Sequence, residues 1–211
     1  MEPGGSETSP RADLLLASAS PRRRELLERV GLTLRLVAPD IDESPREGEA
    51  AADYVRRMAA GKLVAARAAA GDTDLPVLAA DTIVILQGRI LGKPRDREEA
   101  ADMLRRLAGH RHEVTTAYRV AFGAREIDRA VTTAVAFRML DPRELDAYLA
   151  CEEWRGKAGA YAVQGVAAAF VTELRGSLTN VVGLPLAEVL ADLRALGALP
   201  AYPPPRYPTV A

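Results

Sequence analysis

Residues 13–30 read DLLLASASPRRRELLERV and contain an apolar run, a polar turn and an amphipathic segment in direct succession. The run 13–18 is short and apolar, as expected of a buried strand. Ser20 and Pro21 are residue types that favour the N-cap and the first position of a helix. Apolar side chains then recur on one helical face, at Leu26, Leu27 and Val30. The stretch therefore predicts a strand that runs directly into a helix.

Strand-like and helix-like segments alternate along the rest of the chain. Strands are expected over residues 32–37, 76–87, 90–91, 112–122, 130–137 and 166–174, and helices over 50–70, 96–108, 141–151 and 184–196. Such an alternation is typical of a mixed α/β fold built on a strongly twisted central sheet. We expect two lobes with a cleft between them.

The amino-acid composition indicates where the folded region begins and ends. Neither a repeat nor a change of composition marks a linker between residues 12 and 198, so this region is expected to form one unit. Residues 1–11 carry Gly, Ser, Pro and Glu without periodicity, and residues 199–211 are rich in proline. Both ends are interpreted as flexible extensions.

The composition limits the possible partners and location. The chain has 211 residues, 48% hydrophobic and 27% charged, with a formal net charge of −1, which is typical of a globular protein. The balanced charge and the 5% aromatic content disfavour nucleic acid and anionic membranes as partners, so any anion binding must be local. No apolar run approaches the roughly 18 residues that span a bilayer. A single cysteine, Cys151, permits no intrachain disulfide and favours the cytoplasm.

Three consecutive arginines occupy an unfavourable place. Arg22, Arg23 and Arg24 lie in the first turn of the expected helix, where the helix dipole makes each cation cost roughly 0.3–1 kcal/mol. Free N–H groups, the hydroxyls of Ser18 and Ser20, and two guanidinium groups would together bind a phosphate. Alternatively, the arginines are solvated or pair with acidic residues of the same helix, and the local sequence does not decide between these interpretations.

Asp81 interrupts an otherwise apolar strand pattern. An ionised carboxylate buried without a partner costs several kcal/mol, so Asp81 must face a polar cleft, a cation or a metal. A functional role is therefore the favoured interpretation. The loop acids Asp40 and Asp42 are more simply interpreted as solvated.

Other polar residues are informative only in combination. Lys62, Lys93 and Lys157 could each be an ordinary surface charge, although Pro94 holds Lys93 in an extended conformation. Residues 159–165 form a loop of small residues in which the backbone could approach a ligand, and the amide of Gln164 could recognise a base edge.

Taken in order, these segments resemble the Maf family of nucleoside triphosphate pyrophosphatases over roughly residues 14–196. The resemblance is carried by Leu15-Leu-Ala-Ser-Ala-Ser-Pro-Arg-Arg, Asp42-Glu43, Tyr54-Val-Arg-Arg-Met-Ala with Lys62, Ala80-Asp-Thr-Ile-Val, Gly92-Lys-Pro, Lys157-Ala-Gly-Ala-Tyr, Gln164-Gly165 and Asn180-Val-Val-Gly-Leu-Pro. It implies hydrolysis of the α–β phosphoanhydride of a nucleotide with a divalent cation, magnesium or manganese. It also implies a homodimer and the elongated α/β fold of inosine triphosphate pyrophosphatases.

The resemblance also implies roles for individual residues. Asp81 matches the family's proton acceptor, and Glu43, together with Asp81, would hold the metal. The groups around the triphosphate would be Ser18, Ser20, Arg22, Arg23, Lys62 and Lys93. One departure is Gly61, which weakens the helix beside Lys62 by about 1 kcal/mol relative to Ala.

Arg22, Thr82 and Gln164 match the positions that distinguish two branches of the family. A neutral amide pairs with the adjacent carbonyl and N–H of thymine or uracil, so Gln164 favours dTTP and UTP, with modified pyrimidine nucleotides as further candidates. One alternative is a pyrophosphatase for 7-methylguanosine triphosphate, where a glutamate is usual. A second is a non-catalytic nucleotide-binding regulator of cell division, which would not need Asp81.

Overall fold

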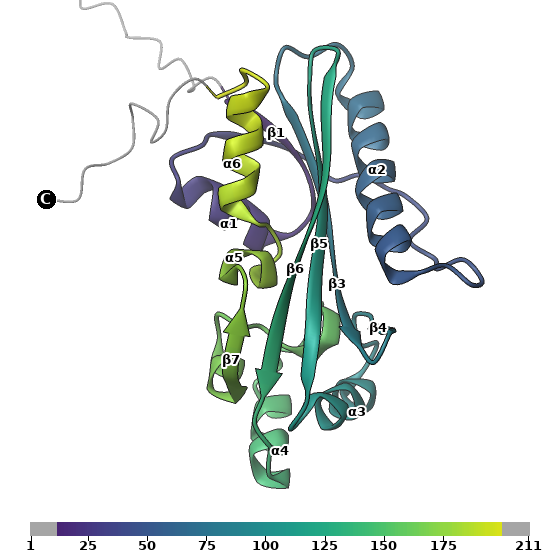
Figure 1. Ribbon diagram of the computed structural model, residues 1–211, viewed down its shortest axis with the longest axis vertical. Helices are drawn as coiled ribbons and strands as arrows, with labels where there is room; N and C mark the ends of the chain where they lie inside the picture. The colour runs from purple at the N-terminus through teal and green to yellow at the C-terminus, as the bar shows by residue number, and fades with distance from the viewer. Residues whose placement is uncertain (1–11, 200–211) are drawn as a thin grey trace, which may run out of the picture.

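The computed structural model describes residues 12–199, which form an elongated molecule (Figure 1). The extensions predicted at residues 1–11 and 199–211 lie outside the described residues, apart from Leu199, which is buried. Within residues 12–199, no helix is both long enough and apolar enough to cross a membrane.

A single mixed sheet runs through the molecule. Its order is β2-β1-β3-β5-β6-β7, and β4 pairs with β3 outside this path. The strands β1 (Leu14–Ala17), β2 (Leu34–Val37) and β3 (Val77–Leu86) are parallel. The remaining pairings are antiparallel and involve β4 (Arg89–Leu91), β5 (Arg111–Phe122), β6 (Arg125–Phe137) and β7 (Val171–Arg175). The long β5 and β6 connect the two ends of the molecule (Figure 1).

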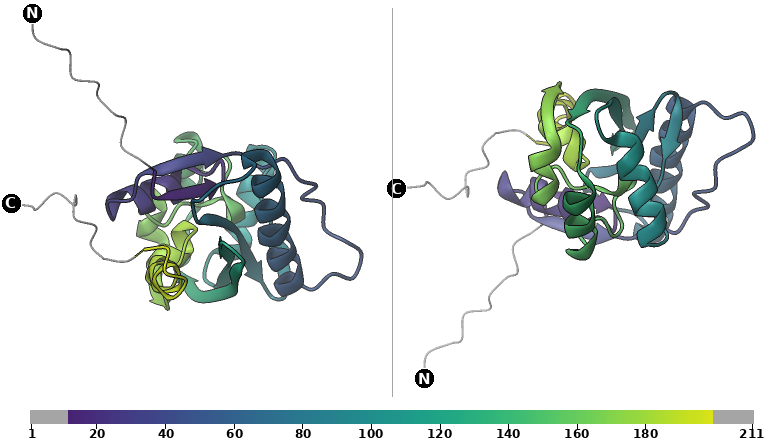
Figure 2. Two further views of the ribbon diagram at one scale, coloured as in Figure 1. Left: turned by 90° about the horizontal axis from the view of Figure 1, so that it is seen from above. Right: turned by 90° about the horizontal axis from the view of Figure 1, so that it is seen from below.

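The helices cover both faces of the sheet, as the views along the long axis show (Figure 2). Six α-helices lie within residues 12–199: α1 (Pro21–Arg29), α2 (Ala51–Ala70), α3 (Arg97–Leu107), α4 (Pro142–Ala150), α5 (Leu178–Val182) and α6 (Leu186–Ala195). Successive residues of β1 point to opposite faces. Leu14 and Leu16 therefore pack with α1 and α6, whereas Leu15 and Ala17 pack with α2.

Among residues 12–199, two of the four apolar clusters lie at opposite ends of the sheet, as expected of the predicted two lobes. One cluster lies at the end of the sheet that carries α1 and α6 and includes Leu27, Tyr118 and Val189. The other lies at the opposite end, beside α3 and α4, and includes Leu104 and Tyr148. The mixed α/β fold with an elongated sheet is thus confirmed.

The prediction of a strand over 166–174 is wrong in its first half. Residues Val166–Phe170 form a 3₁₀ helix, and the strand β7 begins only at Val171. The Glu153 carboxylate accepts hydrogen bonds from the backbone N–H groups of Val166, at 2.9 Å, and Ala167, at 3.3 Å. This contact from a distant segment stabilises a helical turn where the apolar sequence alone suggests a strand.

Two further boundaries differ from the sequence prediction. The closing helix, expected from residue 184, begins at Leu186 because Pro185 occupies its N-cap. The short helix α5 (Leu178–Val182) precedes it and was not predicted. The strand β6 begins at Arg125 instead of residue 130, so the hairpin turns at Gly123, whose φ of +58° suits glycine.

Candidate active site

One edge of β3 is left open at its middle. This edge pairs with β1 as far as Ala79 and with β4 from Val84 onward, while the other edge pairs continuously with β5. Asp81 and Thr82 lie in the open interval. Because neighbouring strand residues point to opposite faces, Asp81 turns toward α2 and Thr82 toward α1 and α5.

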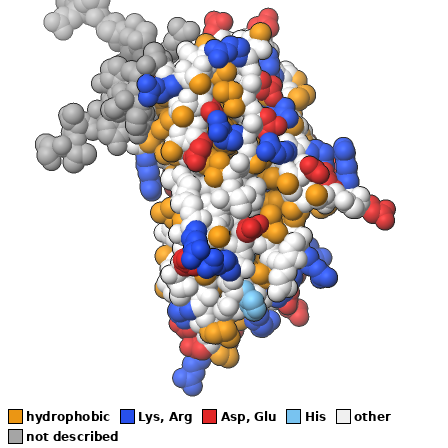
Figure 3. Space-filling view, in the orientation of Figure 1, with side chains coloured by type: hydrophobic (Ala, Val, Ile, Leu, Met, Phe, Trp, Pro, Cys, Tyr) orange, Lys and Arg blue, Asp and Glu red, His pale blue; other side chains and the backbone are white. Residues whose placement is uncertain are grey.

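A pocket of about 420 Å³ opens at this gap and collects every site residue predicted from the sequence. These are Ser18, Ser20, Arg22, Arg23, Glu43, Lys62, Asp81, Thr82, Lys93 and Gln164. Basic and acidic side chains are interspersed over the face drawn in Figure 3. The concentration of cations in the pocket is therefore a local feature, as the net charge of −1 requires.

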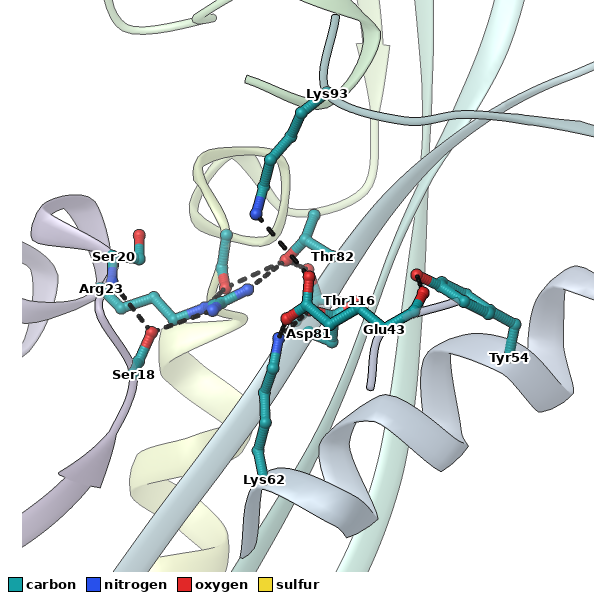
Figure 4. Close-up of polar contacts among 11 residues, drawn as sticks. Ser18, Ser20, Arg23, Glu43, Tyr54, Lys62, Asp81, Thr82, Lys93 and Thr116 are labelled. Atoms are coloured by element: carbon teal, nitrogen blue, oxygen red, sulfur yellow. Dashed lines mark hydrogen bonds and ion pairs between the residues drawn. The ribbon is translucent and has the colours of Figure 1, made fainter. Parts of the chain in front are cut away.

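Lys62 joins the two acidic groups of the pocket (Figure 4). Its Nζ lies 2.6 Å from Asp81 Oδ1 and 2.6 Å from Glu43 Oε1. Lys93 Nζ lies 4.0 Å from the other Glu43 oxygen. Partial burial raises the pKa of Glu43, but the hydrogen bond and charge of Lys62 outweigh this effect, so the pKa is lowered overall. Glu43 is therefore held as a carboxylate.

The loop that carries Glu43 is anchored to the first turns of α2. Tyr54 donates its hydroxyl hydrogen to the backbone oxygen of Glu43 at 2.9 Å. Arg57 donates to the backbone oxygen of Ser44 at 3.0 Å and to both oxygens of Glu49 at 2.6 Å. The hydrogen bond from Arg57 lowers the pKa of Glu49 to about 2. These contacts fix Glu43 although its loop projects from the sheet (Figure 2).

Gly61 has a steric role in the same region. The helix α2 continues through it, and a Cβ atom at this position would lie 3.3 Å from Cδ1 of Ile41 in the Glu43 loop. The missing side chain thus gives the loop room to pack on the helix beside Lys62. Asp40 and Asp42, in contrast, are exposed, as expected of solvated loop acids.

The three consecutive arginines at the start of α1 have different environments. Arg23 is buried and donates from Nε to the Gly183 oxygen at 2.8 Å, from Nη1 to Ser18 Oγ at 3.1 Å and from Nη2 to Thr82 Oγ1 at 2.9 Å. Burial lowers the pKa of Arg23, and the nearby Asp81 charge opposes this shift. Arg24 forms an ion pair with Glu28 at 2.7 Å. For this arginine, the alternative interpretation of pairing within the helix is correct.

Arg22 and Ser20, which the sequence suggests as phosphate ligands, both line the pocket. Arg22 Nε donates to the Val182 oxygen at 3.3 Å, and burial lowers the pKa of its guanidinium. Ser20 is the N-cap of α1, but its side chain makes no capping hydrogen bond. Its backbone N–H instead donates to Ser18 Oγ at 3.1 Å. The Ser20 hydroxyl is therefore not committed to the helix.

Several residues that line the pocket were not predicted as site residues. Arg155 and Lys157 add two cations, so the lining contains six basic side chains against two carboxylates. Burial and the charge of Arg22 lower the pKa of Lys157. The Lys157-Ala-Gly-Ala-Tyr motif signalled Lys157, whereas no pattern in the sequence distinguished Arg155 from a surface arginine.

Gln164 is exposed and lines the pocket. Its neighbour Gly165 packs on Glu153 so closely that a Cβ atom would lie 1.6 Å from the carboxylate. The Glu153 carboxylate also accepts hydrogen bonds from the backbone N–H groups of Val166 and Ala167, which follow the loop. The loop is thus fixed by Glu153, and the Gln164 amide makes no hydrogen bond to another residue within 12–199.

The pocket offers two carboxylates to a divalent cation. Glu43 and Asp81 converge on the same Lys62 ammonium, so their oxygens lie close together. No group of three or more His, Cys, Asp or Glu side chains with metal-binding geometry occurs among residues 12–199. Magnesium is commonly held by one or two carboxylates together with substrate phosphates and water. The donor set fits such a cation only when the substrate completes the coordination.

The sequence resembles a known family and named proteins over most of its length. The family model described as "Maf-like protein" matches residues 13–196. A dTTP/UTP pyrophosphatase of Cereibacter sphaeroides is 53% identical over 190 residues, which cover 90% of this chain and 97% of that protein. A dTTP/UTP pyrophosphatase of Anaeromyxobacter dehalogenans is 53% identical over 188 residues, or 87% of this chain and 94% of that protein. Among solved structures, the Staphylococcus aureus Ham1 protein shows only a weak likeness, with a TM-score of 0.37 and 13% identity over 59% of this chain and 71% of its own. With a matching family model over most of its length and two relatives at this level of identity, the chain belongs to the Maf-like protein family.

Proposed function

We propose that this protein is a nucleoside triphosphate pyrophosphatase that converts dTTP and UTP to the nucleoside monophosphate and pyrophosphate. The observation that carries the proposal is the Asp81 carboxylate, held by Lys62 at the open edge of β3 within a pocket rich in cations. The relatives described above bear the name dTTP/UTP pyrophosphatase, which supports the choice of substrate.

The pocket residues can perform each part of this hydrolysis. The arginines and lysines bind the polyanionic triphosphate and stabilise the charge that develops on the leaving pyrophosphate. Asp81 accepts the proton of the attacking water as general base. Lys62 occupies one oxygen of Asp81 and thereby orients the carboxylate, while the second oxygen can face the water.

We propose that a divalent cation, magnesium or manganese, is required and is held by Glu43 and Asp81. When bound, it would neutralise phosphate charge and orient the phosphate chain. The test is turnover in excess chelator, which should be abolished and should recover on addition of either cation. Full turnover in chelator would contradict the metal requirement and the role of Glu43.

We propose that Gln164, with Arg22 and Thr82, selects thymine and uracil. The exposed amide can pair with both the N–H and the carbonyl of these bases, whereas a cationic methylated guanine would favour a carboxylate. The variant Gln164→Glu should lower kcat/KM for dTTP and UTP about 5- to 150-fold and move the preference toward 7-methylguanosine triphosphate. Equal slowing on all nucleotides would show that Gln164 only braces its loop.

The products formed from UTP distinguish the proposed function from its alternatives. Incubation with UTP should yield UMP and pyrophosphate in equal amounts, and the rate with 7-methylguanosine triphosphate should be lower. Release of UDP and inorganic phosphate would show cleavage at the wrong phosphoanhydride. Tight nucleotide binding without turnover would instead favour the regulator of cell division.

We also propose a cytoplasmic homodimer with a small-molecule nucleotide as its ligand and without a nucleic acid or membrane partner. The single cysteine supports a reducing compartment, and the net charge of −1 gives no general affinity for polyanions. The homodimer follows from the resemblance to the Maf family. Light scattering coupled to size-exclusion chromatography should give twice the mass of the 22.6 kDa chain.

A further inference from the structure

A chain of hydroxyl groups leads from the pocket into the sheet. Thr82 lines the pocket, and its Oγ1 lies 2.9 Å from Oγ1 of Thr116, which is completely buried on the neighbouring strand β5 (Figure 4). Thr116 Oγ1 lies in turn 3.1 Å from the backbone oxygen of Asn180 in α5. The chain ends there, because a carbonyl oxygen can only accept.

The position of Asn180 is itself fixed. This residue is fully buried, and its Nδ2 donates to the Val114 oxygen at 3.0 Å and to Thr133 Oγ1 at 2.9 Å. Its backbone oxygen therefore stays in place as the acceptor for Thr116. Thr116 has one hydroxyl hydrogen and donates it to the backbone oxygen of Asn180.

The single hydroxyl hydrogen of Thr82 must then point into the protein. Since Thr116 has given its hydrogen to Asn180, the short contact between the two threonines requires Thr82 as donor. The other acceptor within reach is the Gly183 oxygen, but this contact is longer, at 3.3 Å, and the same oxygen already accepts from Arg23 Nε at 2.8 Å. In addition, Arg23 donates to Thr82 Oγ1 at 2.9 Å and occupies one lone pair. Thr82 Oγ1 is left with one free lone pair and no free hydrogen, and Thr82 lines the pocket.

We propose that Thr116 and Arg23 fix the Thr82 hydroxyl as a hydrogen-bond acceptor, so that the pocket selects a substrate with an N–H or O–H donor at this point. A phosphate oxygen, which is an acceptor, is disfavoured there. Thr116 is thus a positioning residue for substrate selection. The inference rests on the proposed function for the identity of the substrate.

The proposed substrates narrow the possible donor to two groups. Outside their phosphates, dTTP and UTP share the imide N–H of the base and the 3′-hydroxyl of the sugar. The 2′-hydroxyl is excluded because dTTP lacks it. Either shared group would satisfy Thr82, whereas the cytosine ring nitrogen at the position of the imide N–H carries no hydrogen.

The test measures kcat/KM for UTP, N3-methyl-UTP and 3′-deoxy-UTP with five proteins: the unmodified protein, Thr82→Val, Thr116→Val, Thr116→Ser and Thr115→Val. Thr82→Val removes the acceptor, and Thr116→Val removes the group that holds the Thr82 hydrogen. Thr116→Ser keeps that hydroxyl. Thr115 is the matched control, because it forms a threonine pair with Thr132 at 2.8 Å in the same sheet and does not line the pocket.

The unmodified protein should discriminate against one analogue, which identifies the donor. That discrimination should fall about 3- to 10-fold in Thr82→Val and in Thr116→Val, as expected of one neutral hydrogen bond, and should persist in Thr116→Ser and Thr115→Val. The ratio of substrates is the measurement that a purely structural role of Thr116 would not alter. If Thr116→Val does not fold, Thr82→Val alone decides.

Unchanged ratios in Thr82→Val for both analogues, with normal UTP hydrolysis by the unmodified protein, would overturn the inference and leave the proposed function intact. Absence of any UTP hydrolysis by the unmodified protein would overturn the proposed function instead. The two failures are therefore distinguishable.

Discussion

The Nζ atom of Lys62 lies 2.6 Å from Oδ1 of Asp81. The same ammonium lies 2.6 Å from Glu43, so one nearly buried cation holds two carboxylates from separate segments of the chain. Without it, two like charges would face each other at the edge of a sheet. With it, both carboxylates are held in place at the pocket.

Gly61 tests how the Glu43 loop packs on α2. The variant Gly61→Ala should raise the free energy of unfolding by up to about 1 kcal/mol, because alanine favours the helix. The nearest atom to the new Cβ is the tip of Ile41, a flexible side chain that can move by a few tenths of an ångström. Chemical denaturation measures the change. If Gly61→Ala instead lowers the stability and the added Ile41→Val substitution restores it, the loop cannot move away from the new methyl group.

Tyr54 tests the anchoring of Glu43. Removal of its hydroxyl in Tyr54→Phe deletes the hydrogen bond to the Glu43 backbone and should let the loop move. The divalent cation concentration for half-maximal activity should rise about 2- to 10-fold, as expected for the loss of one neutral hydrogen bond. The Tm should change little.

Arg56→Gln is the matched control for Tyr54→Phe. Arg56 lies on the same helix and pairs with Asp128 at 2.7 Å, on the exposed surface. It should leave the cation dependence unchanged. An equal shift in both variants would mean that α2 as a whole has been disturbed.

His112 should make the protein sensitive to acid. The side chain is 2% exposed and contacts the Tyr161 hydroxyl at 2.8 Å, and burial lowers its pKa from 6.5 to about 4. Between these values only the unfolded chain binds the proton, so stability is lost as the pH falls from about 6.5 toward 4. The loss from this group is on the order of 3 kcal/mol.

The variant His112→Gln isolates that contribution. Its free energy of unfolding should fall less between pH 7 and pH 4 than that of the unmodified protein, whereas the exposed His110→Gln should behave like the unmodified protein. Identical acid dependence in all three proteins would mean that His112 does not titrate as its burial requires.

The parts of the fold and site that depend on local sequence were predictable. The start of α1 follows from Ser20 and Pro21, and Asp81 stands out because an ionised group is costly in an apolar strand. The order of the motifs then predicted four of the six cations that line the pocket. In these cases the residue type itself carries the information.

The parts that depend on distant contacts were not predictable. The 3₁₀ turn at 166–170 exists because Glu153 accepts its N–H groups, and α5 is a helix of only five residues around the buried Asn180. Likewise, Thr116 resembles any strand threonine until the fold places it between Thr82 and Asn180. Such pairings become visible only in three dimensions.

The most direct test of the account is the rate of pyrophosphate release from UTP by Asp81→Asn, measured beside the unmodified protein. Asparagine has nearly the same shape, so the fold should be retained, which circular dichroism and Tm can verify. Asp146→Asn, at an exposed position on α4, is the control and should retain full activity. The loss of the general base should lower the rate about 10²- to 10⁴-fold. A folded Asp81→Asn protein that releases pyrophosphate at a near-normal rate would contradict the central role of Asp81.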